Sequence, residues 1–342
     1  MRQTVFMALS GGVDSAAAAS VLIERGFDVR GVMLRLKPGN SADGDIADAQ
    51  SVAAKLGIPL TVLDCRSEFK LVTDYFCDEY LHGRTPNPCV FCNPALKFGK
   101  ILEYALSQGA DKIATGHYAG IYTAENGDIF IRRTASKKDQ SYFLCRLKKE
   151  TLAHVIFPLE NITKDEARII AANAGLSVAQ KKDSQEVCFI PDNDYISFIE
   201  RERRPEAKPG DFIFTDGTKA GTHGGLYKYT VGQRKGLGAF GVPMYAVALD
   251  YENNTVTVGG NDALFKTRVE LTDMSYINAA PPASPVECFA KIRCAAPPAK
   301  AVLTADGNKA VLEFFEPQRA AAPGQTAAIY FEDLLIGGGT IK

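Results

Sequence analysis

The sequence lacks long hydrophobic runs. Nowhere do its apolar residues approach the roughly 18 consecutive positions that a membrane-spanning helix needs. The apolar run nearest the start, Val5–Leu9, is too short for a secretory signal and is followed by a glycine turn. We therefore expect a protein with no membrane partner and a cytoplasmic location.

Positive charge is not in excess, and cysteine is scarce. The 39 Lys and Arg residues against 40 Asp and Glu give a net charge of −1, which excludes a globally basic nucleic-acid binder. Eight cysteines in 342 residues are too few for a disulfide-built scaffold, so we expect reduced thiols. Positive charge is concentrated locally: residues 132–150 carry seven Lys or Arg against two acids, and residues 219–235 carry four against none. Such patches can contact RNA phosphates, although an isolated run is usually a solvated face.

The first 120 residues alternate between short apolar runs and helical segments. This alternation predicts a doubly wound α/β domain with a parallel sheet, whose ligand sites lie at the carboxyl ends of the strands. The strands are expected at 5–9, 29–36, 60–63 and 112–115, and the helices at 16–24, 47–56, 69–81 and 97–106.

After Pro205 the chain changes to short β-rich runs separated by turn residues. Regularly spaced short strands indicate small β-modules or a barrel. We expect an N-terminal doubly wound domain over 1–199, a small central β-rich module over 200–261 and a C-terminal β-barrel-like module over 262–342. The expected strands are at 212–215, 227–231, 244–250, 255–259, 288–293, 301–304, 310–315 and 327–331.

The string Ser10–Ser15 follows the first expected strand and opens the first helix. Glycines allow a tight turn that aims backbone N–H groups at an anion, and a helix N-terminus adds unpaired donors. Asp14 beside a phosphate calls for a divalent cation between the two, and we expect Mg²⁺. The string lacks the closing Gly-Lys-Ser/Thr of a Walker A loop. It resembles the pyrophosphate-binding loop of N-type ATP pyrophosphatases, which implies activation of a substrate by adenylation.

Three cysteines stand apart from the other five. Cys89 and Cys92 form a Cys-x-x-Cys pair, and we expect Pro86 and Pro88 to hold them in an extended, non-helical loop. Such a pair can bind metal, form a reversible disulfide or carry a persulfide. Three thiolates, with Cys188 as the third, suit a [4Fe–4S] cluster with one open iron. The remaining five are expected to be small buried hydrophobes: Cys65, Cys77, Cys145, Cys288 and Cys294.

Several strings together resemble the bacterial tRNA-specific 2-thiouridylase family, and they span almost the whole chain in the family's order. The resemblance implies that ATP adenylates the C2 oxygen of a wobble uridine in tRNA and that sulfur then displaces AMP. The strings are Ser10–Ser15, Gly83–Asn93 with Lys97 and Phe98, Gly116–Tyr118, 138–144, 181–184 with 188–190, 232–238, 323–325 and 337–339.

The same resemblance implies roles for individual residues. Cys188 would receive a persulfide from a sulfur donor, which is a relay protein, a cysteine desulfurase or sulfide itself. Cys92 would attack that persulfide, releasing sulfide or leaving a transient disulfide. The implied ATP contacts are Ala8, Leu9, Ser10, Gly11, Gly12, Val13, Asp14, Ser15, Leu34 and Gly116. The implied base contacts are Asn87, Pro88 and Cys89, and the implied tRNA contacts are His117, Lys138, Asp139, Gln140, Arg293 and Gln325.

The sequence departs from the family pattern at Cys89, where the family usually has Asp. One hypothesis is that Cys89, Cys92 and Cys188 ligate a [4Fe–4S] cluster that delivers sulfide. The other is cluster-free persulfide chemistry with Cys89 as an accessory or resolving thiol. Three further interpretations stay open: an adenylating enzyme acting on a small metabolite, the same fold acting on another RNA position, and a non-enzymatic tRNA-binding or metal-storage protein. The segment Gly236–Gly241 matches G-x-G-x-x-G, but without a strand–helix unit it favours an RNA-facing or interdomain loop.

Overall fold

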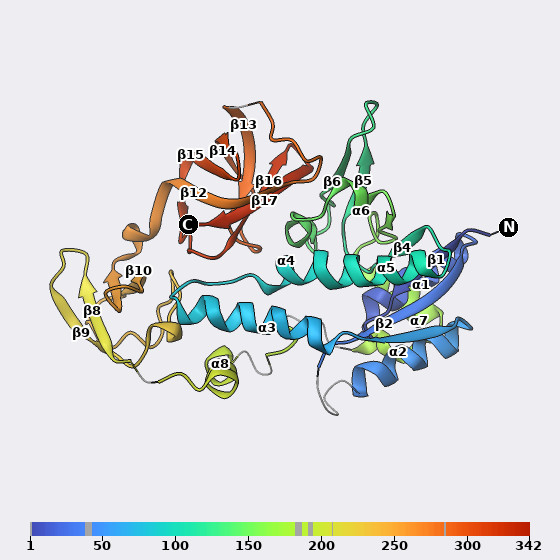
Figure 1. Cartoon of the computed structure of the whole chain (residues 1–342), viewed down its shortest axis with the longest axis horizontal. Coiled ribbons are helices and arrows are strands. Elements are labelled where there is room, and N and C mark those ends of the chain that lie inside the picture. The colour runs from blue at the N-terminus through green and yellow to red at the C-terminus, as the bar shows by residue number, and fades with distance from the viewer. Residues whose placement is uncertain (1, 38–42, 182–186, 191–193, 207, 284) are drawn as a thin grey trace.

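The chain folds around three sheets, which Figure 1 shows with the N-terminal helices and strands at one end and the small central sheet at the other. The structure is a computed structural model that describes residues 2–37, 43–181, 187–190, 194–206, 208–283 and 285–342. Within these ranges no helix is long and apolar enough to cross a membrane.

The N-terminal sheet has five parallel strands in the order β3-β2-β1-β4-β7. Side chains alternate between its two faces, as the twofold period of a strand requires. Val5 and Met7 pack in one hydrophobic cluster, and Phe6 between them packs in the other. The strands are β1 (Thr4–Ala8), β2 (Asp28–Arg35), β3 (Leu60–Asp64), β4 (Lys112–Ala114) and β7 (Val155–Ile156).

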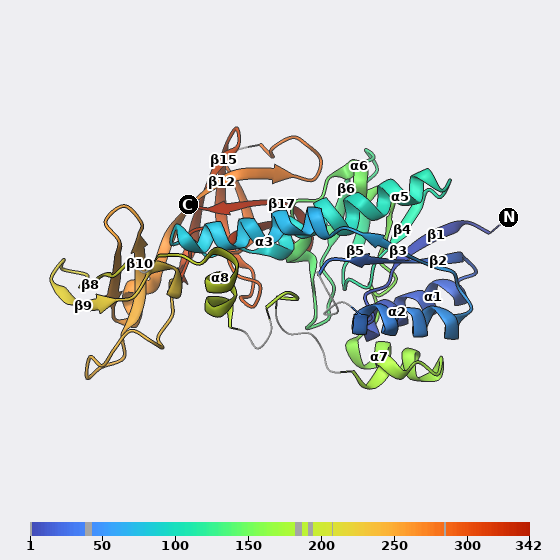
Figure 2. The same ribbon diagram turned by 60° about the horizontal axis from the view of Figure 1, so that its bottom comes forward.

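Helices cover both faces of this sheet, which confirms the predicted doubly wound fold. The helices α1 (Val13–Glu24), α2 (Asp43–Leu56) and α7 (Lys164–Asn173) lie together below the sheet in Figure 2, and α5 (Ile101–Ser107) lies above it. Ala16, Ala17, Ala18 and Ala19 of α1 are fully buried, because their small side chains let the helix pack closely. The remaining helices of this part are α3 (Arg66–Leu81), α4 (Pro88–Cys92), α6 (Lys149–Leu152) and α8 (Tyr195–Arg203).

The Cys-x-x-Cys pair lies on a helix, so the predicted extended loop is wrong. Pro88 is the first residue of α4, where a missing N–H costs no hydrogen bond and a fixed φ favours the helix. The helix continues without a break through a π-helical segment, η2 (Asn93–Lys100), into α5. Cys89 therefore sits in the first turn of a helical segment that runs from Pro88 to Ser107.

The central sheet has the order β10-β11-β8-β9. The strand predicted at 227–231 is wrong: Leu226–Lys228 forms a 3₁₀ turn, η6. Tyr227 and Tyr229 pack into two different hydrophobic clusters, so this segment does not lie along one sheet face. The strands are β8 (Gly210–Phe214), β9 (Lys219–His223), β10 (Tyr245–Asp250) and β11 (Thr255–Gly259).

The C-terminal strands close into a six-stranded antiparallel barrel, because β12 pairs with both β15 and β17. This confirms the β-barrel-like module as a fold class, whereas the boundaries at residues 199 and 261 stay predictions. The strands are β12 (Phe265–Tyr276), β13 (Val286–Lys291), β14 (Ala299–Asp306), β15 (Lys309–Arg319), β16 (Thr326–Phe331) and β17 (Leu334–Ile341).

A hairpin from the N-terminal half extends the barrel sheet. Its strands are β5 (Gly120–Thr123) and β6 (Ile129–Arg132), and β6 pairs antiparallel with β17, with Ile131 opposite Leu335. The hairpin rises from the N-terminal part toward the barrel in Figure 1. The barrel sheet therefore contains strands that are about 200 residues apart in the sequence. Short 3₁₀ segments in the described part of the chain are η3 (Ser141–Leu144), η4 (Ser177–Gln180), η6 and η7 (Asn261–Leu264).

Candidate active site

The loop Ser10–Ser15 leaves the end of β1 and enters α1. Gly11 has φ +70°, a conformation that glycine adopts without strain. Ser15 fixes the turn from inside: its hydroxyl accepts the Ser10 N–H at 3.2 Å and donates to the Gly12 carbonyl at 3.0 Å. The turn thus presents the first N–H groups of α1, which are free of intrahelical partners, at the carboxyl end of the sheet.

A second loop supports the first, because β1 and β4 are neighbours in the sheet. Gly116 lies so close to the loop backbone that a Cβ there would be 2.8 Å from the Asp14 carbonyl carbon and from the Ser15 nitrogen. The Tyr118 hydroxyl, two residues on, donates to Asp14 Oδ1 at 2.7 Å. Lys164, at the start of α7, donates to the same oxygen at 2.7 Å. The carboxylate is thus held in place from two sides.

The other predicted ATP residues surround this turn. Leu9 and Val13 are buried beside it, and the Leu9 N–H donates to the Val32 carbonyl. Ala8 ends β1, and Leu34 lies one residue before the end of β2. The structure therefore brings all the predicted ATP contacts to one edge of the sheet. Lys181 also reaches this edge and donates to Asp48 Oδ2 at 2.7 Å, while Lys182–Glu186 lie outside the described residues.

Residues at one end of the barrel hydrogen-bond to the segment that precedes α4, the helix that carries Cys89 and Cys92. The Thr85 N–H donates to the Pro323 carbonyl at 2.7 Å, and Gln325 Nε2 donates to the Pro86 carbonyl at 3.3 Å. Asn87 is the residue before α4, and the hydroxyl of Tyr142 donates to the Thr326 carbonyl of the barrel at 2.8 Å. These contacts fix the direction in which the first turn of α4 points.

Burial dominates the state of the active-loop thiols. It raises the pKa of Cys92 to about 12 and also raises the pKa values of Cys89 and Cys188. Lys97, one turn of the helix beyond Cys92, opposes the rise at all three sites. Although Cys188 as a whole residue is exposed, the surrounding chain desolvates its sulfur, and a negative charge there raises the pKa values of both Cys89 and Cys92.

Cys294 corrects a prediction. It was expected to be a small buried hydrophobe, but it is exposed on the loop after β13 and its charge reaches Cys89. The other four cysteines expected to be buried are buried: Cys65, Cys77, Cys145 and Cys288.

The thiols do not form a ready ligand set for a cluster. Among the described residues, which include all eight cysteines, no three His, Cys, Asp or Glu side chains are grouped so that they could hold a metal ion. A Mg²⁺ site needs fewer protein ligands, because Mg²⁺ keeps several waters and binds one or two carboxylates together with substrate phosphates. Asp14 supplies such a carboxylate beside the loop.

Most of the predicted tRNA contacts point inward. His117 is buried, its Nδ1 lies 2.8 Å from the Thr115 hydroxyl, and burial lowers its pKa well below the usual value. Asp139 accepts hydrogen bonds from the Thr134 N–H and the Ser141 hydroxyl.

Two further predicted contacts are also engaged within the chain. Gln140 Oε1 accepts the Tyr118 N–H. Arg293 donates to the carbonyls of Ala320 at 3.0 Å and Val231 at 2.7 Å, so it ties the central module to the barrel. Lys138 is exposed on the loop beside Asp139. These residues shape the surface around the site, and their contact with tRNA stays a prediction.

Sequence reasoning missed Tyr118 and Lys164 as partners of Asp14. Tyr118 is buried, with 1% of its surface exposed, so its hydroxyl reaches Asp14 from within the core. Lys164 is 150 residues away from Asp14 in the chain, and only the packing of α1 against α7 brings them together. The one local signal is the Thr163–Glu166 capping box, which places Lys164 at a helix start but gives it no role.

The fold and the site define a class of protein. It is an α/β nucleotide-binding protein that carries, in the same chain, a glycine-rich phosphate loop, a helix with a Cys-x-x-Cys pair and a C-terminal barrel. Family models match in three consecutive parts: a tRNA methyl transferase HUP domain over residues 3–192, a tRNA methyl transferase PRC-barrel domain over 196–260 and an aminomethyltransferase beta-barrel domain over 266–341.

Whole-length relatives give the family. The tRNA-specific 2-thiouridylase MnmA of Heliobacterium modesticaldum is 47% identical and covers 100% of this chain and 93% of its own. The protein of the same name from Acetivibrio thermocellus is 43% identical and covers 100% and 99%. The chain belongs to the tRNA-specific 2-thiouridylase MnmA family. A solved 4-thiouridine synthetase–RNA complex with bound ATP is 18% identical over 58% of this chain and 50% of that chain, with a TM-score of 0.38, which is too weak for any inference.

Proposed function

We propose that this chain uses ATP to replace the C2 oxygen of the wobble uridine of tRNA with sulfur. The observation that carries the proposal is membership, over the whole length, of a family whose members are named for this activity. The phosphate loop and the cysteine helix agree with it, because a uracil carbonyl needs activation before a sulfur nucleophile can displace its oxygen. An adenylating enzyme for small metabolites would not need the cysteine helix.

The first step is adenylation. The uracil O2 attacks the α-phosphorus of ATP, the bond to the β-phosphate oxygen breaks, and pyrophosphate leaves. Backbone N–H groups of Gly11–Ser15 and the start of α1 bind the phosphates. Asp14, oriented by Tyr118 and Lys164, would hold Mg²⁺, which when bound neutralises charge on the phosphate oxygens.

The second step delivers sulfur. Cys188, the exposed thiol of the trio, accepts a terminal sulfur atom from the donor and becomes a persulfide. The Cys92 thiolate attacks the inner sulfur of that persulfide, which forms a Cys92–Cys188 disulfide and releases HS⁻. HS⁻ attacks C2 of the adenylated uracil and AMP leaves with the oxygen. A dithiol reductant then supplies two electrons and restores both thiols. Lys97 favours the thiolate forms that this step requires.

The reaction itself tests the proposal. Purified protein is incubated with an unmodified tRNA transcript, ATP, Mg²⁺ and a persulfide donor, and 2-thiouridine is measured by mass spectrometry together with AMP. We expect one AMP for each thiolated uridine. Cys92→Ser should abolish thiolation and the AMP release that accompanies it but retain tRNA-dependent pyrophosphate release, and Cys65→Ser, a buried cysteine elsewhere, should retain all three. Absence of thiolated product with the wild-type protein and every sulfur source would refute the proposal.

A second experiment separates the two sulfur chemistries. The protein is purified without oxygen, and its iron and acid-labile sulfide are quantified before and after thiolation. The grouping of the thiols favours the persulfide route, which predicts an iron-free protein. It also predicts that Cys89→Asp retains thiolation from a persulfide donor. About four irons per chain, together with loss of activity in Cys89→Asp, would instead establish a cluster held by three cysteines.

A further inference from the structure

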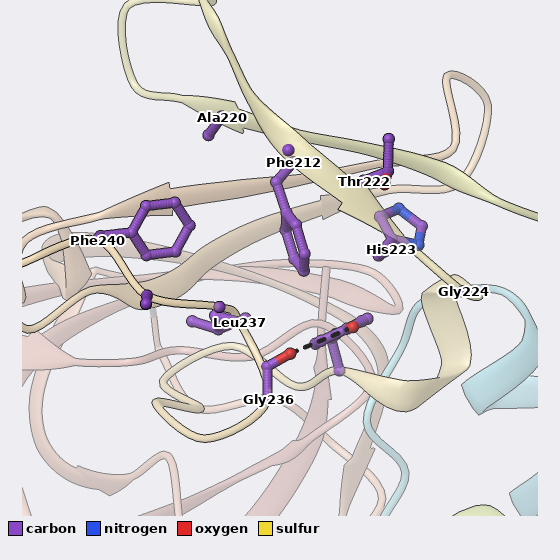
Figure 3. Close-up of a pocket in the computed structure, with 12 residues that line it drawn as sticks. Phe212, Ala220, Thr222, His223, Gly224, Gly236, Leu237 and Phe240 are labelled. Carbon is purple, nitrogen blue, oxygen red and sulfur yellow. Dashed lines mark hydrogen bonds between the residues drawn. The ribbon is translucent and has the colours of Figure 1, made fainter.

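The central module contains a cavity that the proposed reaction does not use. Its volume is about 350 Å³, within the range of roughly 300–1,000 Å³ typical of small-ligand sites. It lies between the β8–β9 hairpin and the glycine-rich loop that follows η6. Figure 3 shows the Phe240 and His223 rings at its two ends, with Phe212 between them.

The walls of the cavity are aromatic and rigid. Phe212, His223 and Tyr229 meet edge to face, with ring centroids 5.3–5.6 Å apart. His223 is locked in one orientation: its Nδ1 accepts the Gly225 N–H at 3.2 Å, so its Nε2 carries the proton and donates to the Asn254 carbonyl at 3.2 Å. Phe240 packs edge-on against Phe214, with the ring centroids 5.9 Å apart and the ring planes at 69°. Phe212, His223 and Tyr229 are buried against one another, so the half-buried Phe240 is the ring on which a planar ligand could stack.

Two exposed cations directly precede the loop that lines the cavity. Arg234 and Lys235 immediately precede the lining residues Gly236–Phe240, and both are exposed. Neither side chain pairs with an acid anywhere in the described ranges, whereas Lys219 and Lys228 of the same module pair with Asp211 and Glu200. Exposed cations without acidic partners attract phosphates. The combination of aromatic walls and unpaired cations is typical of sites that stack nucleic-acid bases and track the backbone.

The central module, which contains the cavity, also contacts the segment that precedes α4. Thr230, next to Tyr229, accepts a hydrogen bond from the Thr85 hydroxyl at 3.3 Å, and Leu226 packs against Gly83. Arg293 holds the Val231 carbonyl from the barrel side. These contacts fix the position of the cavity relative to α4. Two sites that bind one RNA molecule at the same time must be held at a constant separation in this way.

We propose that this cavity receives an unstacked nucleobase of the tRNA substrate, with Arg234 and Lys235 binding the adjoining phosphates. The inference rests on the proposed function for the identity of the RNA. It adds a second base-binding site, separate from the cysteine helix at which the target uridine reacts. Its role is to fix the position of the RNA, so its loss affects RNA affinity and leaves adenylate chemistry intact.

The absence of tryptophan provides a direct test, because Phe240→Trp makes a protein with a single tryptophan in the cavity wall. We expect a tRNA transcript to quench its fluorescence saturably, since a stacked base contacts the indole. Polyphosphate, which has the charge but no bases, should not quench it. The matched control is Val242→Trp, which is on the same loop, 62% exposed and outside the cavity, and it should not respond.

Affinity measurements complete the test. Phe240→Ala should raise the Kd for tRNA about 5- to 150-fold, the range expected for one lost base stack. Ala220→Leu, which fills the cavity from β9, should act in the same direction while the melting temperature stays within a few degrees. Arg234→Gln should weaken binding and reduce the salt dependence of log K by about 0.7–0.9.

The outcomes separate this inference from the proposed function. Wild-type thiolation without quenching in Phe240→Trp, or equal quenching in Val242→Trp, overturns the base pocket alone. Quenching by tRNA without thiolation supports the pocket and overturns the proposed reaction. Quenching by polyphosphate as strong as that by tRNA reduces the site to a phosphate-binding surface and overturns the base assignment.

Discussion

Gly116 gives the sharpest test of how the two loops of the nucleotide site are coupled. Its φ lies outside the left-handed region, so alanine can adopt the backbone conformation. An alanine Cβ, however, would lie 2.8 Å from Asp14 C, 2.8 Å from Ser15 N and 3.0 Å from Asp14 O. All three are backbone atoms and cannot rotate away. Overpacking of this kind costs about 1–3 kcal/mol.

The loop Ser10–Ser15 must move to relieve this clash, so the cost should appear in ATP binding. We expect Gly116→Ala to weaken ATP affinity and ATP–pyrophosphate exchange by about 5- to 150-fold, which is the same free energy expressed as an equilibrium constant. Calorimetric titration with ATP and thermal unfolding measure the two effects separately. Gly44→Ala in α2 is the control, because its Cβ would meet no atom within 4 Å. Unchanged ATP affinity in Gly116→Ala would refute the reasoning, whether or not the melting temperature falls.

Three further predictions concern stability and reactivity. Arg293→Ala should lower the free energy of unfolding by about 3 kcal/mol in urea titrations, because it leaves two carbonyls without their charged donor; an unchanged midpoint would contradict this. Because burial lowers the pKa of His117, its imidazole binds a proton at about pH 6 in the unfolded chain but stays neutral in the folded chain. Stability should therefore fall by up to about 1.4 kcal/mol per pH unit below pH ~6.5, and His117→Asn should reduce that slope; an equal slope in both proteins would count against it. Iodoacetamide should label the exposed Cys188 well before the buried Cys145, whose pKa is raised to about 12, and mass spectrometry of timed samples checks the order.

The elements of the fold that depend on short-range sequence patterns could be predicted from the sequence. The strand–turn–helix at Ser10–Ser15 and the alternation of strands and helices depend on short-range patterns, and the parallel sheet follows from them. The helical start of α4 was missed because two prolines in Gly83–Asn93 were read as breaking a helix. Pro88 instead initiates one, since position in a helix decides what proline does.

The candidate site was predictable only where its residues are neighbours in sequence. Contacts between distant residues, such as Lys164 with Asp14 or Cys294 with the active loop, depend on tertiary packing that leaves no local pattern. The inward hydrogen bonds of Arg293 are of the same kind. A family resemblance names such positions without saying what they touch.

The pairing of β6 with β17 bears on how the chain is made. Ile131 emerges from the ribosome roughly 200 residues before its partner Leu335, so the outer edge of β6 stays unpaired during most of synthesis. An open strand edge is a template for association with other chains. The growing polypeptide therefore passes through a long interval in which its N-terminal part is vulnerable to aggregation, and the synthesis and pairing of β17 end that interval.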